Sequence, residues 1–187
     1  MLNRIIDEIE KSIKNECFIA ALALALTIPD ICGKAEFPNE KNTNSRYIRW
    51  YNEYIGQYEK SIYSEYAEMP YVSGEVVYNL RNALLHQGTP NVDKSKIREE
   101  RCKVDHFVLT ISASHDGGSS GVNAYGLNSD GKEPELVVRY MTVNIVNLCD
   151  KLTRVARKYY EENQDKFDFF DYELKDIRKP PICFEYD

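Results

Sequence analysis

Three polar residues near the middle of the chain, Arg81, Asn82 and His86, combine groups that can act on a phosphate. The guanidinium of Arg81 is a permanently charged fork that matches phosphate oxygens. The imidazole of His86 can take and give a proton near neutral pH, and the carboxamide of Asn82 can orient either group. We therefore assign these three as catalytic candidates for metal-free phosphoryl transfer, such as attack of a ribose 2′-hydroxyl on the adjacent phosphodiester.

In-line attack of this kind needs a base on one side of phosphorus and an acid on the other, whereas this set supplies one histidine per chain. A two-fold dimer with the two helices face to face supplies two histidines and two arginines. We therefore expect a homodimer. A purely structural role for His86 stays open, because the helix dipole also stabilises a protonated histidine in the last turn of a helix.

The three residues lie in the stretch Ser73–Pro90, which predicts one complete helix. Ser73 is a suitable N-cap, Gly88 suits the left-handed position after the last turn, and Pro90 prevents continuation. Tyr78, Asn82 and His86 form a polar stripe, and Tyr78 is our candidate for substrate binding. On an ideal helix Arg81 lies about 140° from His86, but its long side chain can swing toward the same space. The expected apolar face consists of Val76, Val77, Leu80, Ala83 and Leu84.

The run Arg81-Asn82-Ala-Leu-Leu-His86 resembles the signature of the HEPN superfamily (higher eukaryotes and prokaryotes nucleotide-binding domains). That signature is an arginine, four to six residues and then a histidine, usually with a polar residue directly after the arginine. The resemblance implies a metal-independent endoribonuclease whose paired motifs meet at a homodimer interface, with Arg81 and His86 catalytic and Asn82 in support. The helical layout agrees over about Leu2–Gly88 and in the C-terminal helix, whereas about Val104–Val138 is not part of the pattern.

Two functions of different class follow. The first is a metal-independent endoribonuclease that acts as a homodimer in a toxin–antitoxin or phage-defence system, with RNA as substrate and an antitoxin or other regulatory protein as partner. The second is a non-catalytic HEPN-like helical module for dimerisation or for binding a nucleotide or a protein. The surroundings of Arg81 separate them: a shared two-fold cleft favours the enzyme, and a buried ion pair within one subunit favours the module.

Length and composition predict a single domain over residues 1–187, because the chain is long enough for one well-filled core. The net charge of −6 argues against a protein that binds nucleic acid non-specifically over its whole surface, but it allows a local basic cleft. The five cysteines are scattered without zinc-ligand spacing, so we expect free thiols in the cytoplasm, no metal site and no cofactor. The apolar run Cys17–Ile28 is shorter than the roughly 20 residues of a transmembrane helix, so no membrane association is expected.

Hydrophobic periodicity predicts a mainly α-helical bundle of four or five helices. Pro29 and Gly33 are expected to end the first helix, a loop is expected over Gly33–Thr43, and Thr142 is the expected cap of the last helix. An acidic, aromatic tail at about 165–187 is expected to pack loosely on the body or against a partner. The expected helices are Leu2–Ile28, Asn44 or Ser45 to about Tyr63, Ser73–Gly88 and Val143–Gln164.

Aromatic residues recur at helical spacing along the second predicted helix, and Arg46 and Arg49 lie beside them. Arginines interleaved with aromatic rings can hold single-stranded RNA, so these two arginines are further candidates for substrate binding. Such a stripe is, however, more often part of a hydrophobic core. Its members are Tyr47, Trp50 or Tyr51, Tyr54 and Tyr58.

After Pro90 the period changes to that of strands, which we expect at His106–Ser112, Val122–Leu127 and Glu135–Met141. They predict a small antiparallel β-hairpin or sheet inserted at about 104–141, before the last long helix, with a turn at Ser129–Gly131. The loop Ser114–Gly121 lacks the spacing of a phosphate-binding loop, and its His115 and Asp116 are expected to be solvated.

Overall fold

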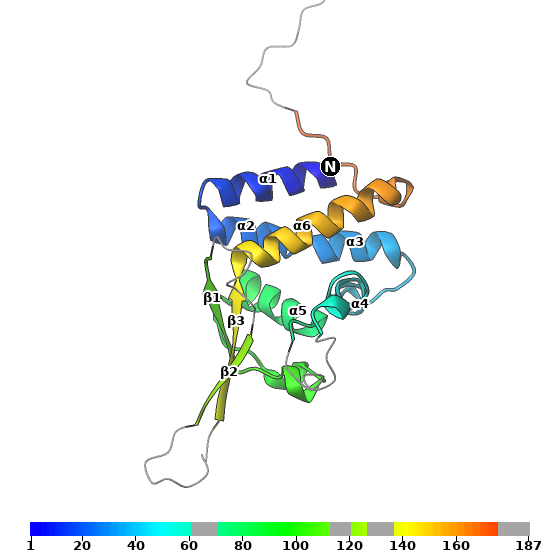
Figure 1. Ribbon diagram of the computed structural model, residues 1–187. Helices are drawn as coiled ribbons and strands as arrows, with labels where there is room; N and C mark the ends of the chain where they lie inside the picture. The colour runs from blue at the N-terminus through cyan, green and yellow to red at the C-terminus, as the bar shows by residue number, and fades with distance from the viewer. Residues whose placement is uncertain (61–70, 113–120, 127–136, 176–187) are drawn as a thin grey trace, which may run out of the picture.

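A computed structural model describes residues 1–60, 71–112, 121–126 and 137–175, and it shows a mainly helical protein with a small β-sheet (Figure 1). The predicted turn at Ser129–Gly131 and the pair His115 and Asp116 lie outside the described residues. The helices are α1 (Leu2–Lys14), α2 (Phe18–Ala25), α3 (Ile28–Glu36), α4 (Thr43–Tyr54), α5 (Gly74–Asn82) and α6 (Ile145–Glu162). The strands are β1 (His106–Thr110), β2 (Gly121–Gly126) and β3 (Val137–Asn144).

The prediction of one continuous helix over Leu2–Ile28 is wrong, because the chain turns between α1 and α2. The backbone of Glu16 adopts the left-handed conformation, with φ of 59°, and this ends the first helix. Pro29 does not terminate a helix here. It lies in the first turn of α3, where its missing N–H has no intrahelical partner to lose.

Gly33 lies inside α3 and not in a loop, because α3 continues to Glu36. A Cβ atom at this position would lie 2.8 Å from the carbonyl oxygen of Arg46 in α4. The glycine therefore allows α3 and α4 to pack closely, and only the segment between Glu36 and Thr43 is a connection.

This close approach makes Gly33→Ala a sharp test of the packing between α3 and α4. Alanine normally favours a helix over glycine by about 1 kcal/mol, but here its methyl group must push the α4 backbone away. We expect a net loss of about 1–3 kcal/mol in the free energy of unfolding, measured by urea denaturation. Alanine at exposed Asn44 is the control and should have little effect. A stabilised Gly33→Ala variant would contradict the close contact.

The second predicted helix begins and ends earlier than expected. Asn42 is the N-cap, since its side chain accepts a hydrogen bond from the backbone N–H of Ser45. The helix ends at Tyr54, and a short 3-10 turn follows at Gly56–Tyr58. The predicted continuation to about Tyr63 extends into residues that are not described.

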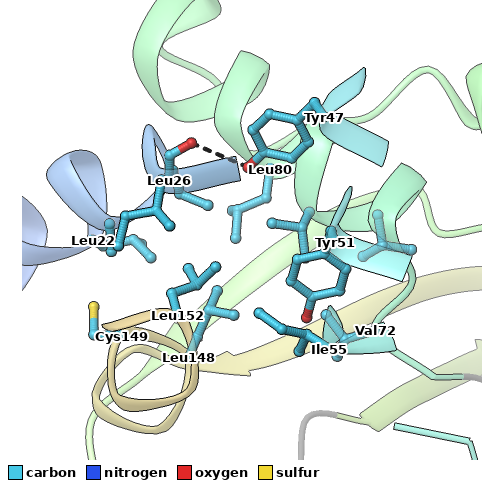
Figure 2. Close-up of a cluster of buried hydrophobic side chains, with 14 of the residues drawn as sticks. Leu22, Leu26, Tyr47, Tyr51, Ile55, Val72, Leu80, Leu148, Cys149 and Leu152 are labelled. Carbon is cyan, nitrogen blue, oxygen red and sulfur yellow. Dashed lines mark hydrogen bonds between the residues drawn. The ribbon is translucent and has the colours of Figure 1, made fainter. Parts of the chain in front are cut away.

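The aromatic stripe of α4 belongs largely to the core. Tyr47, Trp50 and Tyr51 are fully buried. Figure 2 shows Tyr47 and Tyr51 among the apolar side chains of α2 and α6, and the Tyr47 hydroxyl donates to the carbonyl of Leu26 at 3.1 Å. These three rings hold the helices together and are not available to stack on RNA. Tyr58, in contrast, is 78% exposed.

The sheet is mixed, so the prediction of a purely antiparallel sheet is wrong. Its strand order is β1-β3-β2, in which β2 and β3 form the expected antiparallel hairpin and β1 pairs with β3 in parallel. Asp105 sets this register, because its backbone N–H donates to the Arg139 carbonyl and its carboxylate accepts from the Arg139 N–H. β2 pairs with one edge of β3, and β1 pairs with the other.

β3 leads directly into α6 (Figure 1), and Thr142 is therefore part of a strand and not a helix cap. The cap is Asn144, whose side chain accepts from the N–H of Asn147. Beyond α6, Phe167 is buried and Lys166 pairs with Glu36 at 2.7 Å. The beginning of the predicted tail is thus attached to α3.

The described residues include four of the five cysteines and a long apolar stretch in the N-terminal half. Cys32, Cys102 and Cys149 are free and buried, and Cys17 is free and exposed. Phe18–Glu36 is long and apolar enough to cross a membrane by length and composition. Half of its apolar window is buried inside the fold.

Candidate functional site

The helix that carries the candidate catalytic residues begins as the sequence predicts. The Ser73 hydroxyl oxygen accepts a hydrogen bond from the N–H of Val76 at 3.3 Å, so Ser73 is the N-cap. Gly88 has φ of +62° and ends the helical stretch in the left-handed conformation. The apolar face packs into the core, where Val76, Val77, Leu80 and Ala83 are buried.

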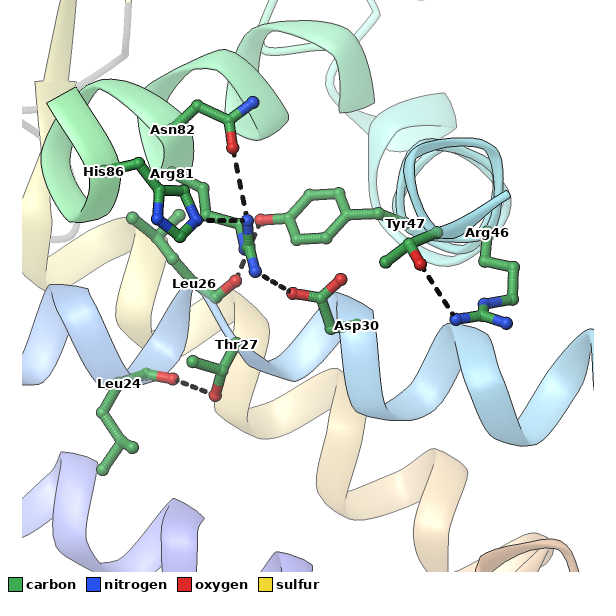
Figure 3. Close-up of polar contacts among 10 residues, drawn as sticks. Leu24, Leu26, Thr27, Asp30, Arg46, Tyr47, Arg81, Asn82 and His86 are labelled. Atoms are coloured by element: carbon green, nitrogen blue, oxygen red, sulfur yellow. Dashed lines mark hydrogen bonds and ion pairs between the residues drawn. The ribbon is translucent and has the colours of Figure 1, made fainter. Parts of the chain in front are cut away.

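The last turn is not α-helical, and this brings Arg81 and His86 together. Residues Ala83–Gln87 form a π-helical turn, whose wider winding brings residues five apart closer to alignment than an α-helix does. Nη1 of Arg81 lies 3.2 Å from Nε2 of His86 (Figure 3). π-Helical turns are frequent at functional sites, and here the turn replaces the separation of about 140° expected on an ideal α-helix.

The contact also assigns a role to one imidazole nitrogen. A guanidinium can only donate hydrogen bonds, so Nε2 of His86 accepts in this contact. Because His86 is exposed, the imidazole is accessible to solvent and to a ligand.

Arg81 has two further partners, and one of them was missed from the sequence. Nη1 donates to the Asn82 side-chain oxygen at 3.3 Å, and Nη2 pairs with Oδ2 of Asp30 at 2.8 Å. Both side chains of the ion pair are about 20% exposed. The only local feature of Asp30 is its place in the first turn of α3, and nothing in the sequence indicated that α3 faces α5 at this point.

Burial of the Asp30 carboxyl group raises its pKa, and the nearby Arg81 only partly opposes this effect. Oδ1 of Asp30 and Nε of Arg81 are also buried without a hydrogen-bond partner among the described residues. The ion pair is therefore incompletely satisfied on both sides. An anion that offered Arg81 more acceptor atoms than Asp30 does could displace the carboxylate.

Tyr78, the candidate for substrate binding on the same helix, is placed beside Arg81. The guanidinium carbon of Arg81 lies 5.9 Å from the ring centre of Tyr78 and 6.0 Å from that of Tyr47. Tyr47 is buried, whereas Tyr78 is partly exposed. The two rings restrict the path of the Arg81 side chain toward Asp30 and His86.

Arg46 and Arg49, the candidates on α4, are engaged elsewhere. Arg46 donates to the Glu40 carbonyl at 2.8 Å and to the Thr43 hydroxyl, and it affects Asp30 only through its charge. Arg49 pairs with Glu53 at 2.7 Å and covers the ring of Phe37. The structure does not bring either guanidinium into hydrogen-bonding contact with the Arg81–His86 pair.

The arrangement provides one proton-transfer group, one cationic fork and one carboxylate in contact with that fork. No group of three or more histidine, cysteine, aspartate or glutamate side chains suited to a metal ion occurs within the part of the chain that the structure describes. The chemistry that these described residues can perform by themselves is binding an anion at Arg81 and moving a proton at His86.

Comparison of this chain with protein-family models, with curated proteins and with solved structures finds no match. The resemblance to the HEPN superfamily therefore depends on the arginine–histidine motif and the helical layout alone.

Proposed function

We propose that this protein is a metal-independent endoribonuclease of the HEPN type that acts as a homodimer. The observation that carries the proposal is the 3.2 Å contact between Arg81 and the acceptor nitrogen of exposed His86. This contact supports the proposal because an imidazole can take a proton and the neighbouring guanidinium can bind a phosphodiester.

In the proposed reaction, the phosphodiester takes the place of Asp30 on the Arg81 guanidinium. Arg81 releases Nε2 of His86 as it turns to the phosphodiester, and the freed nitrogen removes the proton from the ribose 2′-hydroxyl. The 2′-oxygen forms a bond to phosphorus while the bond to the 5′-oxygen breaks. The leaving oxygen receives a proton from the imidazolium of the second subunit. The products are a 2′,3′-cyclic phosphate and a 5′-hydroxyl, and Asn82 orients Arg81 throughout.

The non-catalytic module is the second candidate, and the ion pair between Arg81 and Asp30 favours it. In this function the pair ties α3 to α5, and the fold serves dimerisation or the binding of a nucleotide or a regulatory protein. RNA binding without cleavage by the purified protein would support this module.

Cleavage of a labelled single-stranded RNA by the purified protein tests the proposal, and we expect its rate to be unchanged by EDTA. The reason is that a cationic fork and an imidazole complete the reaction without a metal. A product carrying a 2′,3′-cyclic phosphate is expected. Activity that disappeared with EDTA and returned with Mg²⁺ or Mn²⁺ would show that other residues carry the reaction.

A further inference from the structure

A polar cavity of about 360 Å³ lies between the segment that precedes β1 and strand β3. Two short 3-10 turns, Lys94–Lys96 and Glu100–Cys102, contribute to its wall from one side, and β3 contributes from the other. None of its lining residues belongs to the Arg81–His86 group. The lining residues are three cations, two carboxylates and one serine: Lys94, Lys103, Arg139, Glu100, Asp105 and Ser95.

One of the two carboxylates, that of Asp105, is fixed in place. It accepts hydrogen bonds from the backbone N–H of Arg139 at 2.8 Å and from Nζ of Lys94 at 3.0 Å. The bond from the Arg139 N–H is the main cause that lowers the pKa of this carboxyl group, so Asp105 is ionised near neutral pH. Asp105 therefore stays in the wall of the cavity and balances the charge of Lys94.

The other carboxylate, that of Glu100, is loosely held. It pairs with Nζ of Lys103 at 2.6 Å, but the Glu100 side chain is 78% exposed and that of Lys103 only 28% exposed. An ion pair with such an exposed partner contributes little to stability, so Glu100 can turn into solvent at small cost. Lys103 then remains at the cavity without its counter-ion.

The guanidinium of Arg139 is only weakly engaged. Its Nη1 donates to the backbone carbonyl of Glu100 at 3.4 Å, which is long for a hydrogen bond. Within the described part of the chain this is the one hydrogen bond of the Arg139 side chain. A guanidinium has five N–H donors in a fork that matches phosphate oxygens. Most of these donors are therefore available to a ligand.

We propose that this cavity binds a phosphate dianion, either inorganic phosphate or the terminal phosphate of a nucleotide, with Arg139 and Lys103 as direct ligands. Once the phosphate replaces Glu100, three cations and the Asp105 carboxylate leave two positive charges in the wall. A terminal phosphate carries about −1.5 to −2 charges near pH 7, which matches this balance. The proposal does not rest on the proposed function, because it uses none of the candidate catalytic residues.

Isothermal titration of the purified full chain with 5′-AMP, at constant ionic strength, tests the site. We expect Arg139→Gln and Lys103→Gln each to weaken binding by at least about 10-fold, because each removes a charged hydrogen bond to the phosphate. Arg98→Gln is the matched control. It makes the same change in charge at a side chain that is 92% exposed and outside the cavity, and it should bind as the wild-type protein does. A wild-type protein that binds neither 5′-AMP nor inorganic phosphate would overturn the proposal.

Glu100→Gln tests the exchange between carboxylate and phosphate by the sign of its effect. It removes the competing charge and should strengthen 5′-AMP binding by about 2–5-fold, the range expected for an exposed ion pair. Because this variant strengthens binding, a misfolded protein could not imitate the result. Weaker binding by folded Glu100→Gln would overturn the assigned competition.

Three ligands identify the chemistry that the cavity recognises. A phosphodiester carries a single negative charge, so 3′,5′-cyclic AMP should bind at least about 10-fold more weakly than 5′-AMP, and equal binding would overturn the match to a dianion. A volume of about 360 Å³ lies within the range of about 300–1,000 Å³ of small-molecule sites. We therefore expect 5′-AMP to bind more tightly than inorganic phosphate. Equal affinities would identify inorganic phosphate as the ligand.

The candidate catalytic site also contains a guanidinium, so binding of 5′-AMP there must be distinguished. Arg81→Ala should keep the wild-type affinity for 5′-AMP. Binding that Arg81→Ala abolishes and Arg139→Gln leaves unchanged would overturn this inference and assign the nucleotide to the Arg81–His86 group. A protein that binds 5′-AMP through Arg139 but cleaves no RNA would remove the proposed function and leave the phosphate site standing.

Discussion

Replacing His86 by alanine should reduce RNA cleavage by about 10²–10⁴-fold, the usual contribution of a general acid–base group. Nε2 of His86 is the proton acceptor in the proposed reaction, and among the described residues Arg81 is the one side chain within hydrogen-bonding distance of it. Loss of that exposed hydrogen bond should lower the free energy of unfolding by only about 0.5–1.5 kcal/mol. Cleavage rate and melting temperature are therefore to be measured on the same sample.

The matched control for this variant is His106→Ala, which removes a histidine of β1 that stacks on Tyr140. It should leave the cleavage rate near that of the wild-type protein. If His86 has only a structural role, His86→Ala will melt at a lower temperature and keep its activity per folded molecule. Wild-type cleavage by a folded His86→Ala protein would exclude the ribonuclease reaction at this site.

Replacing Arg81 by alanine should abolish cleavage and also destabilise the fold, since the Asp30 carboxylate then remains partly buried without its cation. We expect a loss of about 1–3 kcal/mol in the free energy of unfolding near neutral pH. Asp30→Asn in the same chain should recover most of this stability, because it removes the unpaired charge, but it should not recover activity. Arg81→Lys should not rescue cleavage either, since an ammonium group lacks the fork.

The effect of pH on this stability loss has a defined sign. The pKa of Asp30 is raised in the folded protein, so the folded state holds this proton more tightly than the unfolded state, and the resulting stabilisation is lost as pH rises through the folded pKa. Without Arg81 the pKa should rise further. The difference between Arg81→Ala and the wild-type protein should therefore be small in acid and largest near neutral pH.

Urea denaturation in acid and near neutral pH measures the difference in free energy of unfolding between Arg81→Ala and the wild-type protein. Arg98→Ala is the control, because the Arg98 side chain is 92% exposed and its pair with Glu75 should contribute little. A loss that did not change with pH, and that Asp30→Asn did not relieve, would show that Arg81 stabilises the fold by packing and not by charge. Unchanged cleavage by Arg81→Ala would remove this residue from the reaction.

The sequence alone determined the features that depend on neighbouring residues. Ser73 and Gly88 set the start and end of the motif helix through local hydrogen bonding and backbone conformation, and both predictions are confirmed. The apolar face of this helix and the antiparallel hairpin of β2 and β3 were likewise predicted. These features depend on residues only a few positions apart, so the order of residue types is enough to predict them.

Only the tertiary structure decided the features that depend on segments distant in the chain. The parallel pairing of β1 with β3 joins residues 34 positions apart in the chain, such as His106 and Tyr140. The break between α1 and α2 at Glu16 could not be predicted from hydrophobic periodicity either, because glutamate rarely adopts a left-handed backbone conformation.

The candidate site shows the same division. Its arginine and histidine were recognisable from their types and spacing, but their contact depends on a π-helical turn, which periodicity cannot distinguish from an α-helical one. Asp30 joined them only because the fold brings the first turn of α3 within reach of Arg81 on α5, about 50 residues later in the sequence. The sequence shows which side chains carry reactive groups, whereas tertiary packing decides which carboxylate lies beside a given charge.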